Sequence, residues 1–315
     1  MRVLITGVSG FVGHYLVEHI VEASPEADIW GLLWAGEFAN APRSVFAIEG
    51  DLTNIYSLKN AVDQAKPEVV FHLAAASSVA SSWDNPGLFL EVNALGTVNL
   101  LEAVRDYDAR IVVSSSAEIY GAVPMAEQPI VESAPLAPIS PYGVSKASQD
   151  LVTAQYFHGH GLDTVRIRPF HHTGPRRPAR FVASSFARQI ARIERGLDPP
   201  CLAVGNLEAI RDITDVRDVV RAYWLGAMHG KGGEAYNVCS GRQTTMQQVL
   251  DGLLTLTDIE VEIEVDPARM RVADIPCQVG DNSRFSDLTG WRAEIPLEQT
   301  LGDLLDWWRD RVRDH

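Results

Sequence analysis

Short apolar runs alternate with helical patterns through the first half of the chain. The runs read as strands, and they fall at residues 3–5, 29–33, 45–48, 69–73, 111–113 and 165–168. Between them, apolar residues recur at helical spacing and predict helices at residues 11–21, 58–65 and 86–106. Short strands that are apolar on both faces and separated by helices indicate a parallel sheet covered on both sides.

The pattern changes after the fifth predicted strand. Five prolines fall within residues 121–141, so this stretch is predicted to be a loop rather than a regular helix or a central strand. A helix restarts at Tyr142. Beyond residue 168 the pattern is mixed, with helices predicted at residues 181–195 and 216–228 and short strands at 201–204 and 211–214. An amphipathic helix is predicted near the end, at residues 297–312.

These elements predict an α/β protein with a doubly wound parallel sheet of the Rossmann type and a smaller α+β lobe. The dinucleotide-binding domain is placed at residues 1–168, with residues 212–239 returning to it. The lobe is placed at residues 169–211 and 240–315. In open parallel sheets, ligands bind at the carboxyl ends of the strands, so the lobe is expected to cover that edge and to bind a substrate there.

A glycine-rich turn follows the first predicted strand and opens the first helix. Gly7, Gly10 and Gly13 have the spacing G-x-x-G-x-x-G, with Phe11 and Val12 between the last two glycines. The first glycine permits a tight turn, the second lets the backbone approach a pyrophosphate, and the third allows close packing of helix on strand. The helix N-terminus adds free N–H donors and a partial positive charge. The turn therefore predicts a bound dinucleotide.

The end of the second predicted strand does not decide between NAD and NADP. A carboxylate there binds the ribose hydroxyls of NAD, and an arginine accommodates the 2′-phosphate of NADP. This chain has Trp34 at that point, followed by Glu37, which is either the acid or a solvated loop residue. Asp51 and Leu52, after the third strand, are expected to meet the adenine edge.

Tyr142 and Lys146 lie four residues apart at the start of a predicted helix, which puts the phenol and the ammonium on one face. A nearby ammonium lowers a tyrosine pKa, so Tyr142 is a candidate proton donor or acceptor. Ser116 follows the fifth strand and is expected to hydrogen-bond the substrate oxygen with which Tyr142 exchanges its proton. Glu118 is either a base that removes a proton from carbon or a solvated carboxylate.

Composition narrows the partners. The chain has 315 residues, 27 basic and 41 acidic, for a formal net charge of −14. A surface this acidic repels nucleic acid and anionic lipid, so neither is expected as a partner. No apolar stretch is expected to reach the ~20 residues that span a bilayer. Three cysteines without metal-ligand spacing suit a reducing compartment, and the protein is expected in the cytoplasm.

Taken together, the glycine turn, His72-Leu73-Ala74-Ala75, Ser116 and Tyr142-x-x-x-Lys146 resemble the extended short-chain dehydrogenase/reductase family over essentially the whole chain. The resemblance implies an enzyme that modifies the sugar of a nucleotide sugar with NAD(P)H. It implies Ser116, Tyr142 and Lys146 as the catalytic triad. It also implies that the cofactor cleft is lined by the residues of the glycine turn and by Asp51, Leu52, Leu73, Ala74, Ala75, Asn93, Tyr142, Lys146 and Phe170.

Several further stretches resemble the branch of this family that handles GDP-mannose derivatives. They are Ser82-Trp83, the segment from Ser140 to Lys146, the run Gly205-Asn206-Leu207-Glu208-Ala209-Ile210-Arg211-Asp212, and the segment from Tyr236 to Gly241. The resemblance implies that a GDP-linked substrate is bound by Ser78, Ser116, Glu118, His171, Arg188, Val204, Asn206, Arg211 and Arg271. An arginine fork suits a diphosphate.

The resemblance leaves the reaction open between a reductase and a dehydratase. The family pattern has Asn where this chain has His171, and the dehydratase pattern has a lysine in the helix after Phe181-Val182 that this chain lacks. The expected reaction is therefore hydride transfer from NAD(P)H to C4 of GDP-4-keto-6-deoxy-D-mannose, giving GDP-D-rhamnose. The alternatives are dehydration of GDP-mannose with Glu118 as the C5 base, C4 epimerisation of another nucleotide sugar, and a non-catalytic dinucleotide sensor. Relatives pair through two long helices, here residues 86–106 and 142–158, which implies a homodimer built on a four-helix bundle.

Overall fold

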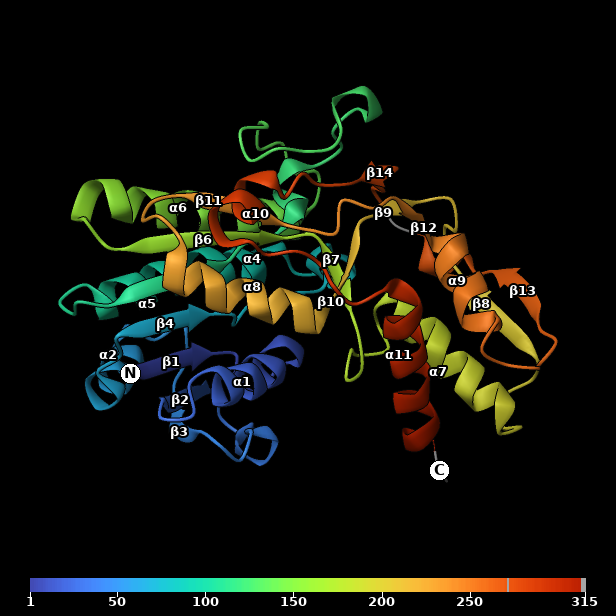
Figure 1. Cartoon of the computed structure of the whole chain (residues 1–315), viewed down its shortest axis with the longest axis horizontal. Coiled ribbons are helices and arrows are strands. Elements are labelled where there is room, and N and C mark those ends of the chain that lie inside the picture. The colour runs from blue at the N-terminus through green and yellow to red at the C-terminus, as the bar shows by residue number, and fades with distance from the viewer. Residues whose placement is uncertain (271, 313–315) are drawn as a thin grey trace.

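The computed structural model describes residues 1–270 and 272–312 of the chain, and within them a seven-stranded parallel sheet forms the centre of the larger part (Figure 1). The strand order is β11-β6-β5-β4-β1-β2-β3, and every neighbouring pair is parallel. The strands are β1 Arg2–Thr6, β2 Asp28–Leu33, β3 Phe46–Glu49, β4 Val69–His72, β5 Arg110–Ser114, β6 Thr164–Pro169 and β11 Ala235–Val238.

Helices cover both faces of this sheet, as the apolar strands require. On one face, α1 (Phe11–Ala23) packs against α8 (Val216–His229) over a core that includes Ile5, Leu16 and Tyr223. On the other face lie α2 (Ile55–Ala65), α5 (Gly96–Val104) and α6 (Pro141–His160), with their own core. The predicted Rossmann-type doubly wound fold is confirmed.

A smaller lobe lies beyond the carboxyl ends of the strands (Figure 1). Its core is formed by α7 (Val182–Glu194), α9 (Met246–Leu254) and α11 (Leu297–Arg311) with β8 (Cys201–Val204), and the exposed strand β13 (Glu262–Val265) pairs with β8 at the edge. A second small sheet has the order β12-β9-β14, from Thr244–Thr245, Ile210–Arg211 and Cys277–Gln278. Two more strands, β7 (His171–Thr173) and β10 (Ile213–Asp215), pair where the two parts meet.

Three segments differ from the sequence prediction. Residues 86–106 form α4 (Pro86–Phe89), a π-helical stretch Leu90–Leu95 and α5, because the hydrogen bonding shifts within one continuous helical run. The strand predicted at residues 211–214 is split between β9 and β10, which belong to different sheets. In addition, α10 (Ser283–Thr289) and Trp291, assigned above to the lobe, pack in the core beside α8 and β11 because their aromatic rings need burial.

The helical run Pro86–Val104 is 19 residues long and apolar enough, by length and composition, to cross a membrane, with 44% of its most apolar window buried. A core helix of a soluble protein meets the same criterion, and this run packs on α2 and α6 of the larger part. The loop at residues 121–139 extends from the body (Figure 1) and is anchored by a bridge between Ile130 and Gly280.

Candidate active site

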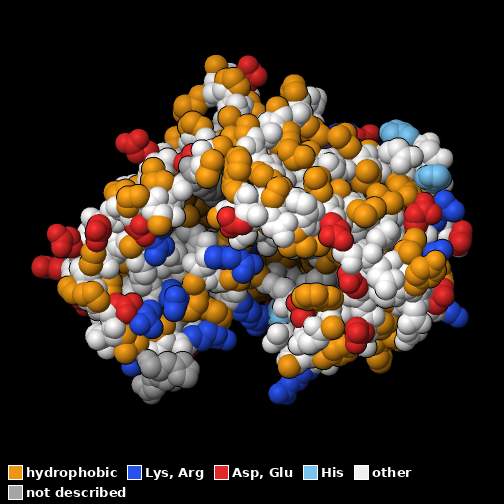
Figure 2. All heavy atoms as spheres, turned by 180° about the vertical axis from the view of Figure 1, so that it is seen from behind, with side chains coloured by type: hydrophobic (Ala, Val, Ile, Leu, Met, Phe, Trp, Pro, Cys, Tyr) orange, Lys and Arg blue, Asp and Glu red, His pale blue; other side chains and the backbone are white. Residues whose placement is uncertain are grey.

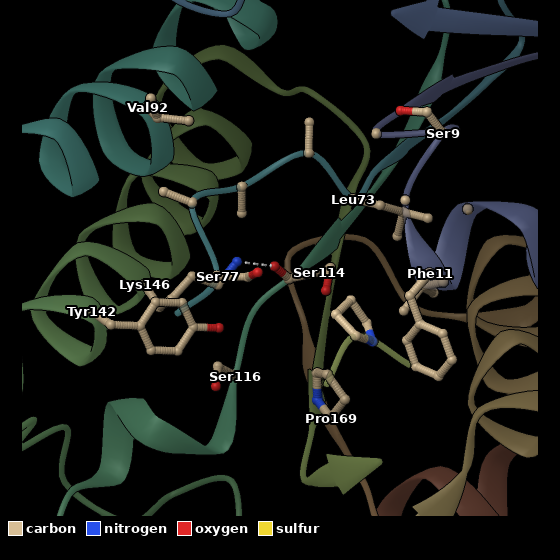
Figure 3. Close-up of a pocket in the computed structure, with 18 of the residues that line it drawn as sticks. Ser9, Phe11, Leu73, Ser77, Val92, Ser114, Ser116, Tyr142, Lys146 and Pro169 are labelled. Carbon is tan, nitrogen blue, oxygen red and sulfur yellow. Dashed lines mark hydrogen bonds between the residues drawn. The ribbon is translucent and has the colours of Figure 1, made fainter. Parts of the chain in front are cut away.

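A cleft of about 1250 Å³ opens at the carboxyl ends of the parallel strands. Its lining runs from the glycine turn, past the ends of β4, β5 and β6, to Arg311 on the last helix of the lobe. Figure 3 shows side chains from the glycine turn, β4, β5 and α6 around this space. Sequence segments far apart therefore meet at the strand edge where open parallel sheets bind ligands.

The glycine turn fits a dinucleotide cradle by its geometry. Gly7 has φ +72°, and a Cβ there would lie 2.7 Å from the backbone nitrogen of Ala74. A Cβ on Gly13 would lie 2.4 Å from the carbonyl oxygen of Gly7, so helix and strand pack backbone to backbone. Gly10 caps α1 with no side-chain hydrogen bond, which leaves the N–H groups of the first turn free for an anion.

Most of the predicted cofactor residues line the cleft together. The lining includes Gly7, Gly10, Phe11, Val12, Gly13, Asp51, Leu52, Leu73, Ala74, Ala75, Tyr142, Lys146 and Phe170. Asn93 is outside the lining and fully buried. Its side-chain amide bonds both the N–H and the carbonyl of Ala76, at 2.8 and 2.9 Å, and the Ser145 hydroxyl at 2.9 Å. Asn93 therefore holds the cleft wall in place rather than facing a cofactor.

Ser116, Glu118, Tyr142 and Lys146 come together in the cleft lining. Ser116 follows β5, whereas Tyr142 and Lys146 lie in the first two turns of α6. That helix starts where it does because the Ser140 hydroxyl accepts the N–H of Gly143 at 3.0 Å and Pro141 occupies the first turn. In Figure 3 the phenol of Tyr142 points from α6 toward the segment that carries Ser116.

The electrostatics of Tyr142 differ from the sequence expectation. The pKa of its phenol is raised to about 12, chiefly by burial and also by the charge of Glu118. A hydrogen bond from Ser116 and the charge of Arg177 act in the opposite direction. The expected lowering of the Tyr142 pKa by Lys146 is therefore wrong for this structure, because burial outweighs the effects of Ser116 and Arg177. Tyr142 is kept protonated, as a proton donor must be.

The ammonium of Lys146 is held by a network of buried hydrogen bonds. Its Nζ donates to the carbonyl oxygen of Ser114 at 2.5 Å and to Gln149. Gln149 in turn donates to Thr97 Oγ1 at 2.8 Å, and the same oxygen lies 2.8 Å from Nε2 of His72. Burial lowers the pKa of Lys146 to about 7. Burial and the nearby Lys146 charge lower the pKa of His72 to about 3, so this histidine is neutral.

Arginines that the sequence analysis did not assign to the site form one side of the cleft. The lining includes Arg176, Arg177, Arg180 and Arg311, and Figure 2 shows Lys and Arg side chains gathered beside a hollow between the two parts. The guanidinium of Arg177 stacks on the rings of Phe11 and Phe181, at 4.9 and 3.5 Å from their centroids.

Arg177 has the character of an anion-binding group. Its Nε is buried without a hydrogen-bond partner in the described part of the chain, and burial lowers its pKa to about 9. A desolvated guanidinium gains from an anionic ligand, since charged groups in such a site cost free energy until they are paired. The sequence signal for this group was the run Arg176-Arg177-Pro178-Ala179-Arg180 directly after β7.

The substrate residues expected from the resemblance divide into two groups. Ser116, Glu118 and His171 line the cleft, as does the neighbouring His172. Ser78, Arg188, Val204, Asn206 and Arg211 lie outside the lining, and Arg271 lies outside the described residues.

Local contacts account for the residues outside the lining. Val204 is fully buried in the lobe core. Asn206 and Arg211 both bond the carboxylate of Asp274, at 2.7 and 2.9 Å. The guanidinium of Arg188 lies over Trp308, 5.8 Å from its ring centroid. Ser78 caps the short helix α3 (Val79–Ser82) by accepting the N–H of Ser81.

Comparisons with known proteins identify a family and several relatives. The family model for GDP-mannose 4,6 dehydratase matches residues 4–304. The GDP-6-deoxy-D-mannose reductase of Pseudomonas aeruginosa is 36% identical, with 99% of each chain covered. A GDP-mannose 4,6-dehydratase of Yersinia enterocolitica is 28% identical, covering 100% of this chain and 95% of the relative.

Similar solved structures include UDP-glucose 4-epimerases, such as the enzyme of Thermus thermophilus at a TM-score of 0.88 and 31% identity over 99% of this chain and 100% of that one, and also a member of the GDP-mannose group. The structure of RMD from Pseudomonas aeruginosa complexed with NADPH superposes with a TM-score of 0.87 and 34% identity, covering 99% of this chain and 100% of that one. The likeness spans both the sheet and the lobe, and the glycine turn and the Ser116, Tyr142 and Lys146 group lie in one cleft. The chain therefore belongs to the GDP-mannose 4,6-dehydratase family of extended short-chain dehydrogenases/reductases.

Proposed function

We propose that the protein is a reductase that converts GDP-4-keto-6-deoxy-D-mannose to GDP-D-rhamnose with a nicotinamide cofactor. The observation that carries the proposal is the end-to-end likeness to a GDP-6-deoxy-D-mannose reductase, with 99% of each chain covered. The protonated state of Tyr142 supports the same direction, since reduction of a ketone consumes a proton.

In this proposal the chain's own residues protonate and position the ketone. The bound cofactor supplies a hydride. Tyr142 would donate its phenolic proton to the oxygen at C4, and Ser116 would hydrogen-bond the same oxygen. Both side chains line the cleft, and their mutual hydrogen bond aims them at one point. Positioning and stabilisation of the developing oxyanion are the main sources of rate.

Lys146 would hold the ribose next to the nicotinamide, and the glycine turn would hold the pyrophosphate. The arginines of the cleft would face the phosphates of cofactor and substrate, supported by the unpaired Nε of Arg177. Asn206, Arg211 and Arg271 stay a prediction for the guanine end. For Asn206 and Arg211 this requires that the bonds to Asp274 open or that Asp274 takes part.

Dehydration of GDP-mannose is the second candidate function. Glu118 favours it, because this carboxylate is buried in the cleft lining and lies close enough to Tyr142 to raise its pKa. In this second candidate function Glu118 would be the base that removes the C5 proton. Replacement of Glu118 therefore distinguishes the two functions, since the reductase reaction does not need a base that removes a proton from carbon.

One experiment tests the proposal against this alternative. The purified protein is incubated with GDP-mannose, and separately with the 4-keto-6-deoxy sugar nucleotide plus reduced cofactor. Oxidation of the cofactor in the second mixture alone is expected. Conversion of GDP-mannose without added reductant would assign the dehydratase instead, and Glu118→Gln would then abolish that conversion.

A homodimer through α4, α5 and α6 is proposed as well. Large apolar side chains are exposed on the π-helical stretch and on α6, and they are Leu90, Leu95, Val144 and Leu151. Exposed apolar side chains gathered on neighbouring helices favour an association surface. The three cysteines are unpaired, which supports the proposed cytoplasmic location.

A further inference from the structure

The connection after β2 turns back toward the glycine turn. The N–H of Glu37 donates to the carbonyl oxygen of Trp34 at 3.0 Å, and Gly36 between them has φ +89°. This is the conformation of a type II turn, which needs a glycine at its third position. The acid thus lies four residues past the end of the strand, yet the turn returns its side chain to the dinucleotide site.

The returned carboxylate is fixed to the glycine turn itself. Ser9 donates its hydroxyl to Oε2 of Glu37 at 2.8 Å. Both residues line the cleft, together with Gly10, Asp51 and Leu52, which stand where the adenosine half of a dinucleotide would lie. Oε1 of Glu37 accepts no hydrogen bond within residues 1–270 and 272–312, so this half-buried carboxylate of the cleft lining keeps one acceptor oxygen for a ligand.

We infer that Glu37, held by Ser9 at the adenosine end of the cleft, makes the enzyme prefer NADH over NADPH. The unbonded Oε1 accepts a hydrogen bond from a ribose hydroxyl. A 2′-phosphate replaces that donor with acceptor oxygens and negative charge, which the carboxylate repels. Ser9 cannot compensate, because its only hydroxyl proton is committed to Glu37.

Basic groups near the adenosine end of the cleft do not cancel the effect of Glu37 on the cofactor preference. The arginines of the lining belong to the loop after β7 and to α11, and Arg176 is paired with Glu18 at 2.7 Å. Arg43 lies in the connection between β2 and β3, but it is exposed and outside the lining. His14 lies one helical turn into α1, with Nδ1 3.0 Å from the carbonyl oxygen of Gly10.

This inference deepens the proposed function, because it rests on the chain binding a nicotinamide cofactor, but it does not depend on which sugar is reduced. The test is therefore direct binding, by titrating the purified protein with NADH and with NADPH and following nicotinamide fluorescence. The wild-type protein is expected to bind NADH at least tenfold more tightly. Glu37→Gln is expected to weaken the binding of NADH and strengthen the binding of NADPH, which brings the two dissociation constants within about threefold of each other.

Two control variants separate the effect of Glu37 from the effects of other charges. Glu26→Gln removes the same charge from an exposed glutamate that also accepts a serine hydroxyl, from Ser24 at 3.1 Å, and is expected to leave the preference unchanged. Arg43→Gln is expected to change it less than twofold. A wild-type preference for NADPH that Arg43→Gln abolishes would overturn the inference and leave the reductase proposal intact. Saturable binding of neither cofactor would overturn both.

Discussion

At the scale of single residues, burial controls the protonation of the groups that are proposed to react. Tyr142 is held neutral with a pKa of about 12, while the pKa of Lys146 falls to about 7. The spacing of these two residues predicted their proximity but not their charge states. Desolvation depends on segments far away in sequence, such as the loop that carries Arg177, and no local pattern reports it.

Replacement of Tyr142 by phenylalanine tests the proposed acid. Tyr142→Phe removes the proton that the oxygen at C4 must receive, so kcat is expected to fall by about 10²–10⁴-fold. Cofactor dissociation constants are expected to change less than threefold. Tyr56→Phe is a matched control, because that tyrosine is 81% exposed on α2. Turnover that survives in Tyr142→Phe would rule out the phenol as the acid.

The buried ammonium of Lys146 predicts a pH dependence of stability. Its folded pKa of about 7 lies below the ordinary value of 10.5, so between these limits the unfolded chain binds more protons. Stability therefore rises with pH across this window, by up to about 1.4 kcal/mol per unit, and the gain is lost as pH falls toward 7.

Urea unfolding of wild type and Lys146→Met at pH 7, 8.5 and 10 measures this contribution. The wild type is expected to gain stability relative to the variant as the pH increases. A constant difference between the two proteins over this range would show that the folded-state pKa of Lys146 is not depressed.

The structure brings predicted site residues into one cleft where position along a single element decides their place. Gly7, Ser116 and Tyr142 all line one cleft because each lies just beyond a strand or at the start of a helix. Val204 was predicted to touch substrate and is instead fully buried in the lobe core. Side-chain direction on a short lobe strand depends on packing partners that sequence spacing does not identify.

At the scale of elements, the β1–turn–α1 unit depends on direct backbone packing. In Gly13→Ala the new Cβ would meet the carbonyl oxygens of Gly7 and Val8 at 2.4 and 2.5 Å. Since backbone atoms cannot rotate away, the variant is expected to lose about 1–3 kcal/mol of stability and to weaken cofactor binding.

A second glycine supplies the control for this substitution. Gly302 lies inside α11, and a Cβ there would meet only the Leu256 side chain, at 4.0 Å. Gly302→Ala is expected to gain about 0.5–1 kcal/mol through helix propensity. Thermal unfolding of both variants measures the contrast, and equal effects would contradict the close-packing argument for Gly13.

Strands of the central sheet were predictable because they are apolar on both faces, which few other segments are. The elements of the lobe were harder to predict from the sequence. The segment around Asp212 changes sheets within five residues, since the Asp212 carboxylate collects the N–H groups of Ser240, Gly241 and Gly280. Contacts of such long sequence separation give no periodic signal along the chain.

At the scale of the whole molecule, apolar side chains on the π-helical stretch Leu90–Leu95 and on α6 remain exposed in the single chain. Leu95 and Leu151 are 52% and 56% exposed there. If two copies pair there, Leu95→Glu with Leu151→Glu buries charge in the interface and shifts the protein to monomer at micromolar concentration.

Sedimentation velocity measures this shift. Val265→Glu changes an equally exposed apolar residue on β13, away from these helices, and is expected to leave the association state unchanged. A wild-type protein that sediments as a monomer would contradict the proposed dimer. The two-part arrangement itself was predictable from the change of pattern after residue 168, whereas the return of α10 to the large core was not.

Isotope transfer shows whether the protein delivers hydride from the nicotinamide to the sugar. The protein is incubated with the 4-keto-6-deoxy derivative of GDP-mannose and NADH deuterated at the transferring position of the nicotinamide, and the sugar is examined by NMR. Deuterium bound to C4 of a GDP-6-deoxyhexose, at one atom per cofactor oxidised, is expected. A deuterium-free sugar, or consumption of GDP-mannose in the absence of reductant, would contradict the account.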